Sequence, residues 1–126
     1  MILFVEDDSA LIDTCFMLLD LHGYEVSVAR DAQDALAQMK WQTPELIITD
    51  WLMPGMDGIT LAQHVRRQQA WRHVPIILIS GSLPRMDGPL PFERFLHKPF
   101  LAETLMETIG QLLELPAAYP APLALR

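Results

Sequence analysis

The chain has 126 residues, 51% of them hydrophobic, which suits one domain with a substantial buried core. Its formal net charge of −7 disfavours direct binding to DNA or RNA, because an acidic surface repels phosphate. No apolar run reaches the ~18 residues of a membrane span and no secretory signal opens the chain, so we expect a cytoplasmic location without membrane insertion. The only cysteine, Cys15, cannot form an internal disulfide and is expected to be a small core residue.

Short apolar runs alternate with longer amphipathic segments along the chain. The apolar runs are typical of buried parallel strands, and the amphipathic segments are typical of helices. Ser9 and Asp31 are expected to cap the first two helices, because each precedes a helical pattern with a side-chain oxygen. In chain order the pattern predicts a strand at 2–5, a helix from 9 to about 22, a strand at 24–29, a helix at 32–41, a strand at 45–49, a helix at 58–69, a strand at 76–79, a strand at 94–97 and a helix at 101–115.

The segment 81–91 interrupts this alternation. It contains three prolines and two glycines, and a proline costs ~3 kcal/mol inside a helix. The fourth helix of the series is therefore predicted to be short, irregular or missing. Alternating strands and helices still predict an α/β fold with a parallel sheet, in one domain at 1–115 followed by a proline-rich tail or linker at 116–126.

Polar side chains follow the predicted strands at their carboxyl ends, where ligands bind in open parallel sheets. These residues are Glu6, Asp7, Asp8, Asp50, Ser80 and Lys98. If their strands are neighbours, several carboxylates, a hydroxyl and an ammonium converge, and a hard cation such as Mg²⁺ relieves the repulsion between the acids. An aspartate beside such a cation can attack phosphorus and form an acyl phosphate. Each residue alone has an ordinary explanation, such as capping a helix or holding a turn, so the combination carries the argument.

The sequences that surround these residues resemble the receiver domains of two-component response regulators. The resemblance covers about residues 1–115 and includes Phe4–Asp8, Ile47–Gly58, Ile79–Gly81 and Lys98–Phe100, in the order and spacing of that family. It implies a flavodoxin-like (CheY-like) fold with five parallel strands in the order 2-1-3-4-5. It also implies a signalling phosphoacceptor that catalyses only its own phosphorylation and dephosphorylation, with a sensor histidine kinase or a histidine phosphotransfer protein as donor and an unknown protein as target.

The resemblance also implies roles for individual residues. Asp50 would accept the phosphoryl group. Asp7 would bind Mg²⁺ directly, Glu6 would bind it through water, and the backbone carbonyl of Leu52 would be a further ligand beside Asp50. Lys98 would contact the acids and then the phosphoryl group.

Further roles concern the switch. Ser80 would turn toward a phosphoryl oxygen, Gly81 would leave space for the phosphoryl group, and Phe95 would turn inward on activation. The Lys98–Pro99 peptide would be cis.

Three features depart from the family pattern. Ser80 replaces a commoner threonine and keeps the hydroxyl, whereas Phe95 lacks the phenol hydroxyl of the usual tyrosine. The segment 81–91 stands where the family has a helix that serves output and dimerisation. This departure affects the usual mode of dimerisation and leaves the expected phosphorylation chemistry unchanged.

The first predicted helix carries two apolar stripes, although a helix on a sheet needs only one. The surplus indicates either a docking surface for a phosphotransfer partner or a wider buried face. The candidate docking residues are Asp8, Leu11, Ile12 and Phe16. Among the tryptophans, Trp41 and Trp71 are expected to cover the edge of the core, and Trp51 is expected to report on binding at Asp50 by its fluorescence.

Two other functions are alternatives to a phosphorylation switch. A small phosphatase or phosphotransferase with Asp50 as nucleophile would need a second acid two residues later and a cap domain, and the chain offers neither. A pseudo-receiver would bind proteins without phosphoryl turnover. The presence of all the required acids, the hydroxyl and the lysine disfavours it, while the unusual 81–91 segment keeps it as the alternative.

Overall fold

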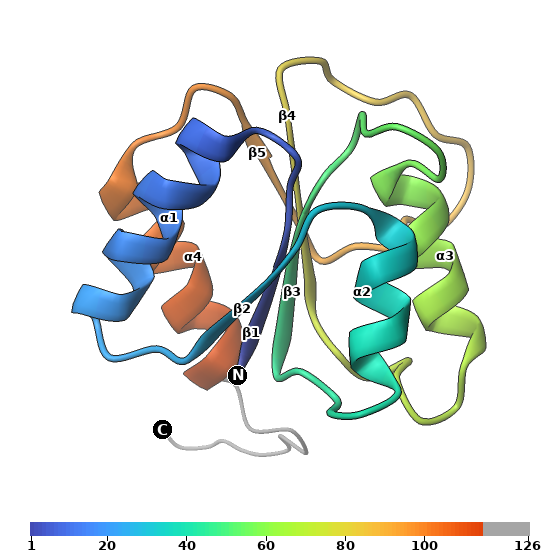
Figure 1. Ribbon diagram of the computed structural model, residues 1–126. Helices are drawn as coiled ribbons and strands as arrows, with labels where there is room; N and C mark the ends of the chain where they lie inside the picture. Colours follow the sequence, from blue (N-terminus) through green and yellow to red (C-terminus); the bar gives the residue numbers. More distant parts are fainter. Residues whose placement is uncertain (115–126) are drawn as a thin grey trace, which may run out of the picture.

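The computed structural model describes residues 1–114, which form a parallel sheet between two pairs of helices (Figure 1). The elements in chain order are β1 (Ile2–Val5), α1 (Ser9–Leu21), β2 (Val26–Ala29), α2 (Ala32–Met39), β3 (Leu46–Asp50), α3 (Gly58–Arg67), β4 (Ile76–Ser80), β5 (Arg94–His97) and α4 (Ala102–Glu114). The predicted elements all occur, with ends that agree to within two residues. The predicted tail at 116–126 lies outside the described residues.

The sheet has the strand order β2-β1-β3-β4-β5, and every neighbouring pair is parallel. The α/β class and the flavodoxin-like strand order are thereby confirmed. In this order β1 and β3 are adjacent, and β4 and β5 continue the sheet, so the carboxyl ends of these four strands share one edge.

Each face of the sheet has its own apolar core. Alternate side chains of a strand point to opposite faces, so Leu3 and Val5 of β1 join the core under α2 and α3, whereas Ile2 and Phe4 join the core under α1 and α4. Figure 1 shows the two helix pairs on opposite sides of the sheet. The central strands are buried throughout, which explains why they are continuous apolar runs in the sequence.

Short acidic side chains start three of the helices. Asp31 caps α2 as predicted, and Asp57 caps α3 by accepting a hydrogen bond from the amide of Thr60. The prediction of Ser9 as the first cap is wrong. Asp8 is the cap because its backbone is extended and its carboxylate accepts hydrogen bonds from the amides of Ala10 and Leu11, which makes Ser9 the first helical residue.

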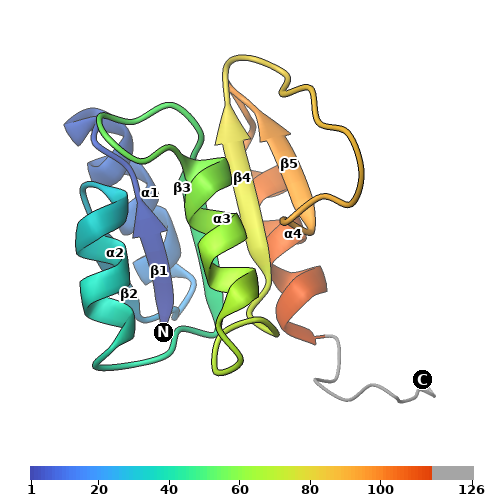
Figure 2. The same ribbon diagram turned by 90° about the vertical axis from the view of Figure 1, so that its right-hand side faces the viewer.

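The connection between β4 and β5 contains no helix, as predicted for 81–91. Figure 2 shows it as a long loop that passes beside β5. The loop still contributes to the core, because Phe92 is buried and Met86 packs against the cluster under α2 and α3. Phe92 and Met86 thus pack against the core from irregular backbone, where a helix would otherwise supply apolar side chains.

The expectations for Cys15 and for two of the tryptophans can be compared with their exposure. Cys15 is buried, and Trp71 packs partly buried against the core, as predicted. The prediction for Trp41 is wrong, because α2 ends at Met39 and the indole of Trp41 is 92% exposed. None of the helices within residues 1–114 is long and apolar enough to cross a bilayer.

Candidate functional site

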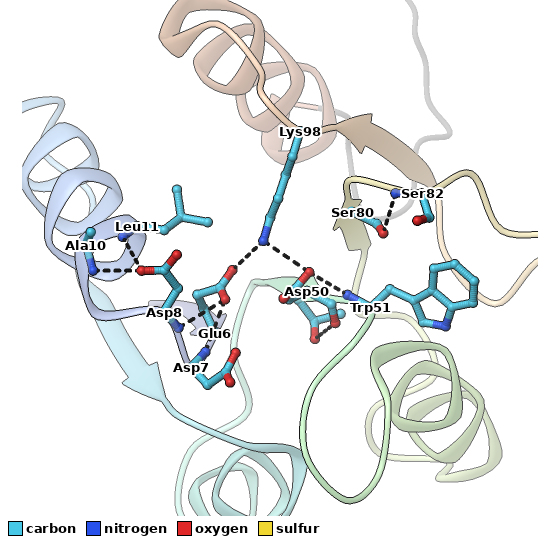
Figure 3. Close-up of polar contacts among 11 residues, drawn as sticks. Glu6, Asp7, Asp8, Ala10, Leu11, Asp50, Trp51, Ser80, Ser82 and Lys98 are labelled. Carbon is cyan, nitrogen blue, oxygen red and sulfur yellow. Dashed lines mark hydrogen bonds and ion pairs between the residues drawn. The ribbon is translucent and has the colours of Figure 1, made fainter.

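The polar residues predicted from the strand ends lie together at the carboxyl edge of the sheet (Figure 3). Glu6 and Asp7 follow β1, Asp50 is the last residue of β3, and Ser80 is the last residue of β4. Lys98 follows β5 and precedes a cis proline, as the resemblance implies. The parallel strand order alone brings these side chains together from positions up to 92 residues apart in the chain.

Three carboxylates form the centre of the site. Glu6, Asp7 and Asp50 each offer an oxygen, and these oxygens lie within 4.8 Å of one another. Glu6 is 1% exposed and Asp50 is 7% exposed, while Asp7 is exposed at the rim. Oxygen ligands on one or two carboxylates, with room for water on the exposed side, are what Mg²⁺ prefers in proteins. The residues present therefore fit a magnesium ion.

Lys98 partly balances the charge of these acids. Its Nζ lies 3.1 Å from Oε1 of Glu6 and 3.2 Å from Oδ1 of Asp50. Burial alone would lower the pKa of Lys98, but the hydrogen bond and charge of Glu6, followed by those of Asp50, raise it above the ordinary value. The ammonium is therefore charged at neutral pH and can interact with any anion that approaches Asp50.

Glu6 is held by contacts on both of its oxygens. Oε1 accepts a hydrogen bond from Lys98, and Oε2 accepts hydrogen bonds of 3.2 Å from the amides of Asp7 and Asp8. Burial raises the pKa of Glu6, and the negative charge of Asp50 raises it further. The cluster therefore stores electrostatic repulsion that a bound cation would relieve.

The backbone around Asp50 is tightly packed. The amide of Trp51 donates a 2.9 Å hydrogen bond to Oδ1 of Asp50, which orients the carboxylate. A Cβ atom on Gly58 would collide with the backbone carbonyl of Asp50 and lie 3.1 Å from the hydroxyl oxygen of Thr49. The glycine that closes the loop motif after Asp50 is therefore needed for space. Leu52 lies in this loop with 59% of its surface exposed.

Ser80, one of the two predicted switch residues, lies beside Asp50 of the acid cluster, and Phe95, the other, lies within β5 (Figure 3). Ser80 is buried, and its Oγ accepts a 3.0 Å hydrogen bond from the amide of Ser82. In Figure 3 Ser80 and Glu6 lie on opposite sides of Asp50. Phe95 is half-buried against the core, with its ring edge-on to His97 at a centroid distance of 6.5 Å. A Cβ atom on Gly81 would meet nothing within 4 Å, so open space exists next to Ser80.

A groove beside Lys98 bears on the proposed docking residues. It has a volume of about 480 Å³ and lies between α1 and the start of α4. Leu11 lines it, Asp8 forms its rim while capping α1, and Phe16 is 43% exposed on the same helix. Ile12 is different, because it is 7% exposed and belongs to the core, so the structure removes it from the docking surface.

Of the apolar side chains of α1, Leu11, Cys15 and Leu18 line the groove, Ile12 and Leu19 are buried in the core, and Phe16 is exposed outside the groove. The other wall of the groove was missed from the sequence, since it is formed by Phe100 and Ala102 from the far end of the chain. Arg30 was missed as well. Its Nη2 donates a hydrogen bond to the carbonyl oxygen of Asp7. The sequence could have pointed to Arg30, because it follows β2 directly and so lies at the same sheet edge as the acids.

Comparisons with known proteins agree with this geometry. A family model described as the response regulator receiver domain matches residues 2–110. Chemotaxis protein CheY-3 of Vibrio cholerae is 31% identical over 118 residues, which cover 90% of this chain and 91% of that protein. The phosphate regulon transcriptional regulatory protein PhoB of Escherichia coli is 28% identical over 112 residues, which cover 86% of this chain and 49% of PhoB. This chain thus spans about half the length of PhoB.

Comparison with a solved structure also shows similarity to a receiver domain. The receiver domain of the hybrid histidine kinase CckA is 36% identical and superposes with a TM-score of 0.75, over 90% of this chain and 98% of that one.

Proposed function

Since this chain belongs to the response regulator receiver domain family of two-component systems, we propose that Asp50 accepts a phosphoryl group in a Mg²⁺-dependent reaction. The observation that carries the proposal is the position of the Asp50 carboxylate. It lies at the end of β3, within 4.8 Å of the carboxylate oxygens of Glu6 and Asp7 and 3.2 Å from the ammonium of Lys98. The receiver domain would comprise residues 1–115.

The proposed donor is the phosphohistidine of a sensor kinase or of a phosphotransfer protein. A carboxylate oxygen of Asp50 attacks the phosphorus atom, and an acyl phosphate forms as the phosphorus–nitrogen bond breaks. The electron pair of that bond returns to the donor imidazole, which takes up a proton from solvent. Because the protein passes on a phosphoryl signal and transforms no other substrate, it acts as a signalling module that catalyses only its own phosphorylation and dephosphorylation.

The acids and the lysine share the electrostatic work. Asp7 and Asp50 would hold Mg²⁺ directly, Glu6 would hold it through water, and the backbone carbonyl of Leu52 would complete the protein ligands. The bound cation would neutralise charge on the transferring phosphoryl oxygens. Lys98 already pairs with Asp50 at 3.2 Å, so its ammonium is placed to contact a phosphoryl oxygen once Asp50 is modified.

The phosphoryl group would act as a switch through Ser80 and Phe95. The hydroxyl of Ser80 would leave the amide of Ser82 and donate to a phosphoryl oxygen, in the space beside Gly81. The half-buried ring of Phe95 would then turn further inward. Moving from ~1% to ~99% active requires about 5.5 kcal/mol of differential stabilisation, which a few charged contacts and aromatic repacking can supply.

The first experiment is intact mass spectrometry after incubation with Mg²⁺ and acetyl phosphate, with Asp50→Asn as the matched control. A gain of one phosphoryl group that requires Mg²⁺ and is lost in the control would support the proposal. No gain in a folded protein that binds Mg²⁺ would favour the pseudo-receiver. A short-lived acyl phosphate would also give no gain in mass, so beryllofluoride binding is measured by Trp51 fluorescence in the same samples. Absence of beryllofluoride binding would reject Asp50 as a phosphoacceptor.

We also propose that the phosphotransfer partner docks at the groove between α1 and α4. Asp8 and Leu11 line this groove, which opens beside Lys98 at the proposed phosphoacceptor site. Phe16, exposed on α1 outside the groove, remains a candidate for a further contact. The variant Leu11→Asp should keep Mg²⁺-dependent labelling by acetyl phosphate, which is too small to need the groove, but lose labelling by purified phosphorylated histidine phosphotransfer domains. Met17→Asp is the matched control, because Met17 is 61% exposed on α1 and does not line the groove.

A further inference from the structure

Arg30 connects the end of β2 to the loop that carries the first two acids. Its Nη2 donates a 3.1 Å hydrogen bond to the backbone carbonyl oxygen of Asp7 and another of 3.1 Å to the hydroxyl oxygen of Ser9. Asp7 belongs to the cluster of three carboxylates, and Ser9 is the first residue of α1. One exposed guanidinium therefore ties the β1–α1 loop to the neighbouring strand.

The main chain of Asp7 is consequently held from two directions. On the inner side, its amide donates to the buried carboxylate of Glu6 at 3.2 Å. On the outer side, its carbonyl accepts from Arg30. These two contacts fix the peptide groups on either side of the Asp7 Cα atom, and so they limit the directions in which its carboxylate can point.

The side chain of Asp7 is left free by the same arrangement. Among residues 1–114, the ion pairs involve Met1, Glu45, Arg66, Glu93, Lys98, Glu6 and Asp50, and neither Asp7 nor Arg30 takes part in them. Within the same residues the carboxylate of Asp7 also accepts no hydrogen bond. Arg30 thus binds the backbone of an acidic residue without neutralising its carboxylate.

We propose that Arg30 is a positioning residue of the metal site: it holds the main chain of Asp7 so that the free carboxylate faces Glu6 and Asp50. This inference rests on the proposed Mg²⁺ site. The positioning effect of Arg30 can be separated from the effect of its charge, because the two change the affinity for Mg²⁺ in opposite directions. A cation near the site repels Mg²⁺, so removing only its charge would strengthen Mg²⁺ binding, whereas removing the support of Asp7 would weaken it.

The test measures Mg²⁺ binding by isothermal titration calorimetry, together with the thermal unfolding midpoint in the absence of Mg²⁺. Arg30→Met removes the donors and keeps an apolar stem, and it should weaken Mg²⁺ binding about three- to tenfold, the size expected for losing the two hydrogen bonds that order the loop. Arg30→Lys restores a donor of similar reach and should recover most of the affinity. Ser9→Ala removes one of the two contacts without changing charge and should cost about twofold.

Arg67→Met is the matched control for net charge, because Arg67 is exposed on α3 and lies outside the acid cluster. It should leave Mg²⁺ affinity unchanged. Equal or tighter binding by Arg30→Met than by the wild type would overturn the positioning role while leaving the proposed function intact. A lower unfolding midpoint of Arg30→Met with unchanged Mg²⁺ affinity would also overturn the positioning role, since Arg30 would then only stabilise the loop. Absence of Mg²⁺ binding by the wild type would reject the metal site and the inference with it.

Discussion

Gly58 illustrates how a single residue limits the geometry of the site. The Asp50 carbonyl lies so close to Gly58 that any Cβ atom there must displace backbone, and backbone cannot yield as the end of a side chain does. We predict that Gly58→Ala lowers the free energy of unfolding by about 1–3 kcal/mol, or more if the loop cannot relax. Urea denaturation monitored by circular dichroism measures this directly.

Gly81→Ala is the matched control for this variant. A Cβ atom at Gly81 meets nothing within 4 Å, so the unfolding free energy should change by no more than about 0.5 kcal/mol. Equal losses in the two variants would show that backbone freedom, and not space beside Asp50, makes glycine necessary at position 58.

Glu6 should make stability depend on pH. Its pKa is raised in the folded protein, by burial first and by Asp50 second, so the folded chain holds the proton more tightly than the unfolded chain does. The contribution of Glu6 to the unfolding free energy must then fall as the pH rises from 4.5, the ordinary pKa of a glutamate, through the raised pKa of Glu6 in the folded protein.

The measurement compares the wild type with Glu6→Gln, which cannot titrate, in denaturant titrations across this pH range without Mg²⁺. The unfolding free energy of the wild type minus that of the variant should decrease with rising pH. A difference that increases would mean that the contact with Lys98 outweighs burial and that the pKa of Glu6 is lowered in the folded state.

At the scale of elements, the end of the loop between β4 and β5 is held in place by the side chain of Glu93, which we call the polar anchor. Glu93 accepts a 2.7 Å hydrogen bond from the amide of Ile76 at the start of β4 and pairs with Arg66 of α3 at 2.6 Å. Arg66 also donates to the carbonyl oxygens of Arg72 and Val74. One ion pair therefore joins α3, the turn that follows it, β4 and the entry to β5.

We predict that Glu93→Ala destabilises the protein by about 1–3 kcal/mol, because the amide of Ile76 and the guanidinium of Arg66 both lose their acceptor. A domain of this size should then unfold roughly 4–11 °C lower, which differential scanning calorimetry measures. The comparison variant is Glu107→Ala, an exposed acid on α4 outside the ion pairs of residues 1–114, for which the shift should be within the scatter of surface substitutions. Similar shifts in both variants would assign no special role to the anchor.

At the scale of the molecule, charge is distributed unevenly between the two helical layers. The helices α1 and α4 contain acids and no lysine or arginine, whereas α3 ends in His64, Arg66 and Arg67. The proposed docking groove lies in the acidic layer. A phosphotransfer partner suited to this surface would surround an apolar ridge with basic side chains, and its association rate would fall as ionic strength increases.

The proposed metal site also links ligand binding to the stability of the whole fold. Its proposed ligands come from the ends of two different strands, so Mg²⁺ would bind the folded chain and not the unfolded one. At a Mg²⁺ concentration 100 times the dissociation constant, the stabilisation should be about 2.7 kcal/mol. Thermal unfolding of the wild type should shift upward with Mg²⁺, while Asp7→Asn, which loses a proposed direct ligand, should shift much less. Equal shifts in the two proteins would place the ion elsewhere.

Much of the fold was predictable from the sequence because the physical signals were local. The buried central strands appear as uninterrupted apolar runs, the cap Asp31 precedes its helix, and the prolines of 81–91 exclude a regular helix. The candidate site residues could be named because parallel strands place their carboxyl ends at one edge, so Asp50 and Lys98 were expected to meet although they are far apart in the sequence.

The sequence by itself determined the residue types at each strand end, the order of elements and hence the family. Only the tertiary structure decided which side chains of α1 face the core, because Ile12 and Leu11 are both apolar and differ only in what packs against them. It likewise decided that Trp41 is exposed, that Phe100 completes the groove and that Arg30 reaches Asp7. Such contacts join segments distant in sequence, and their geometry depends on how strands and helices are packed, which no local pattern of residues specifies.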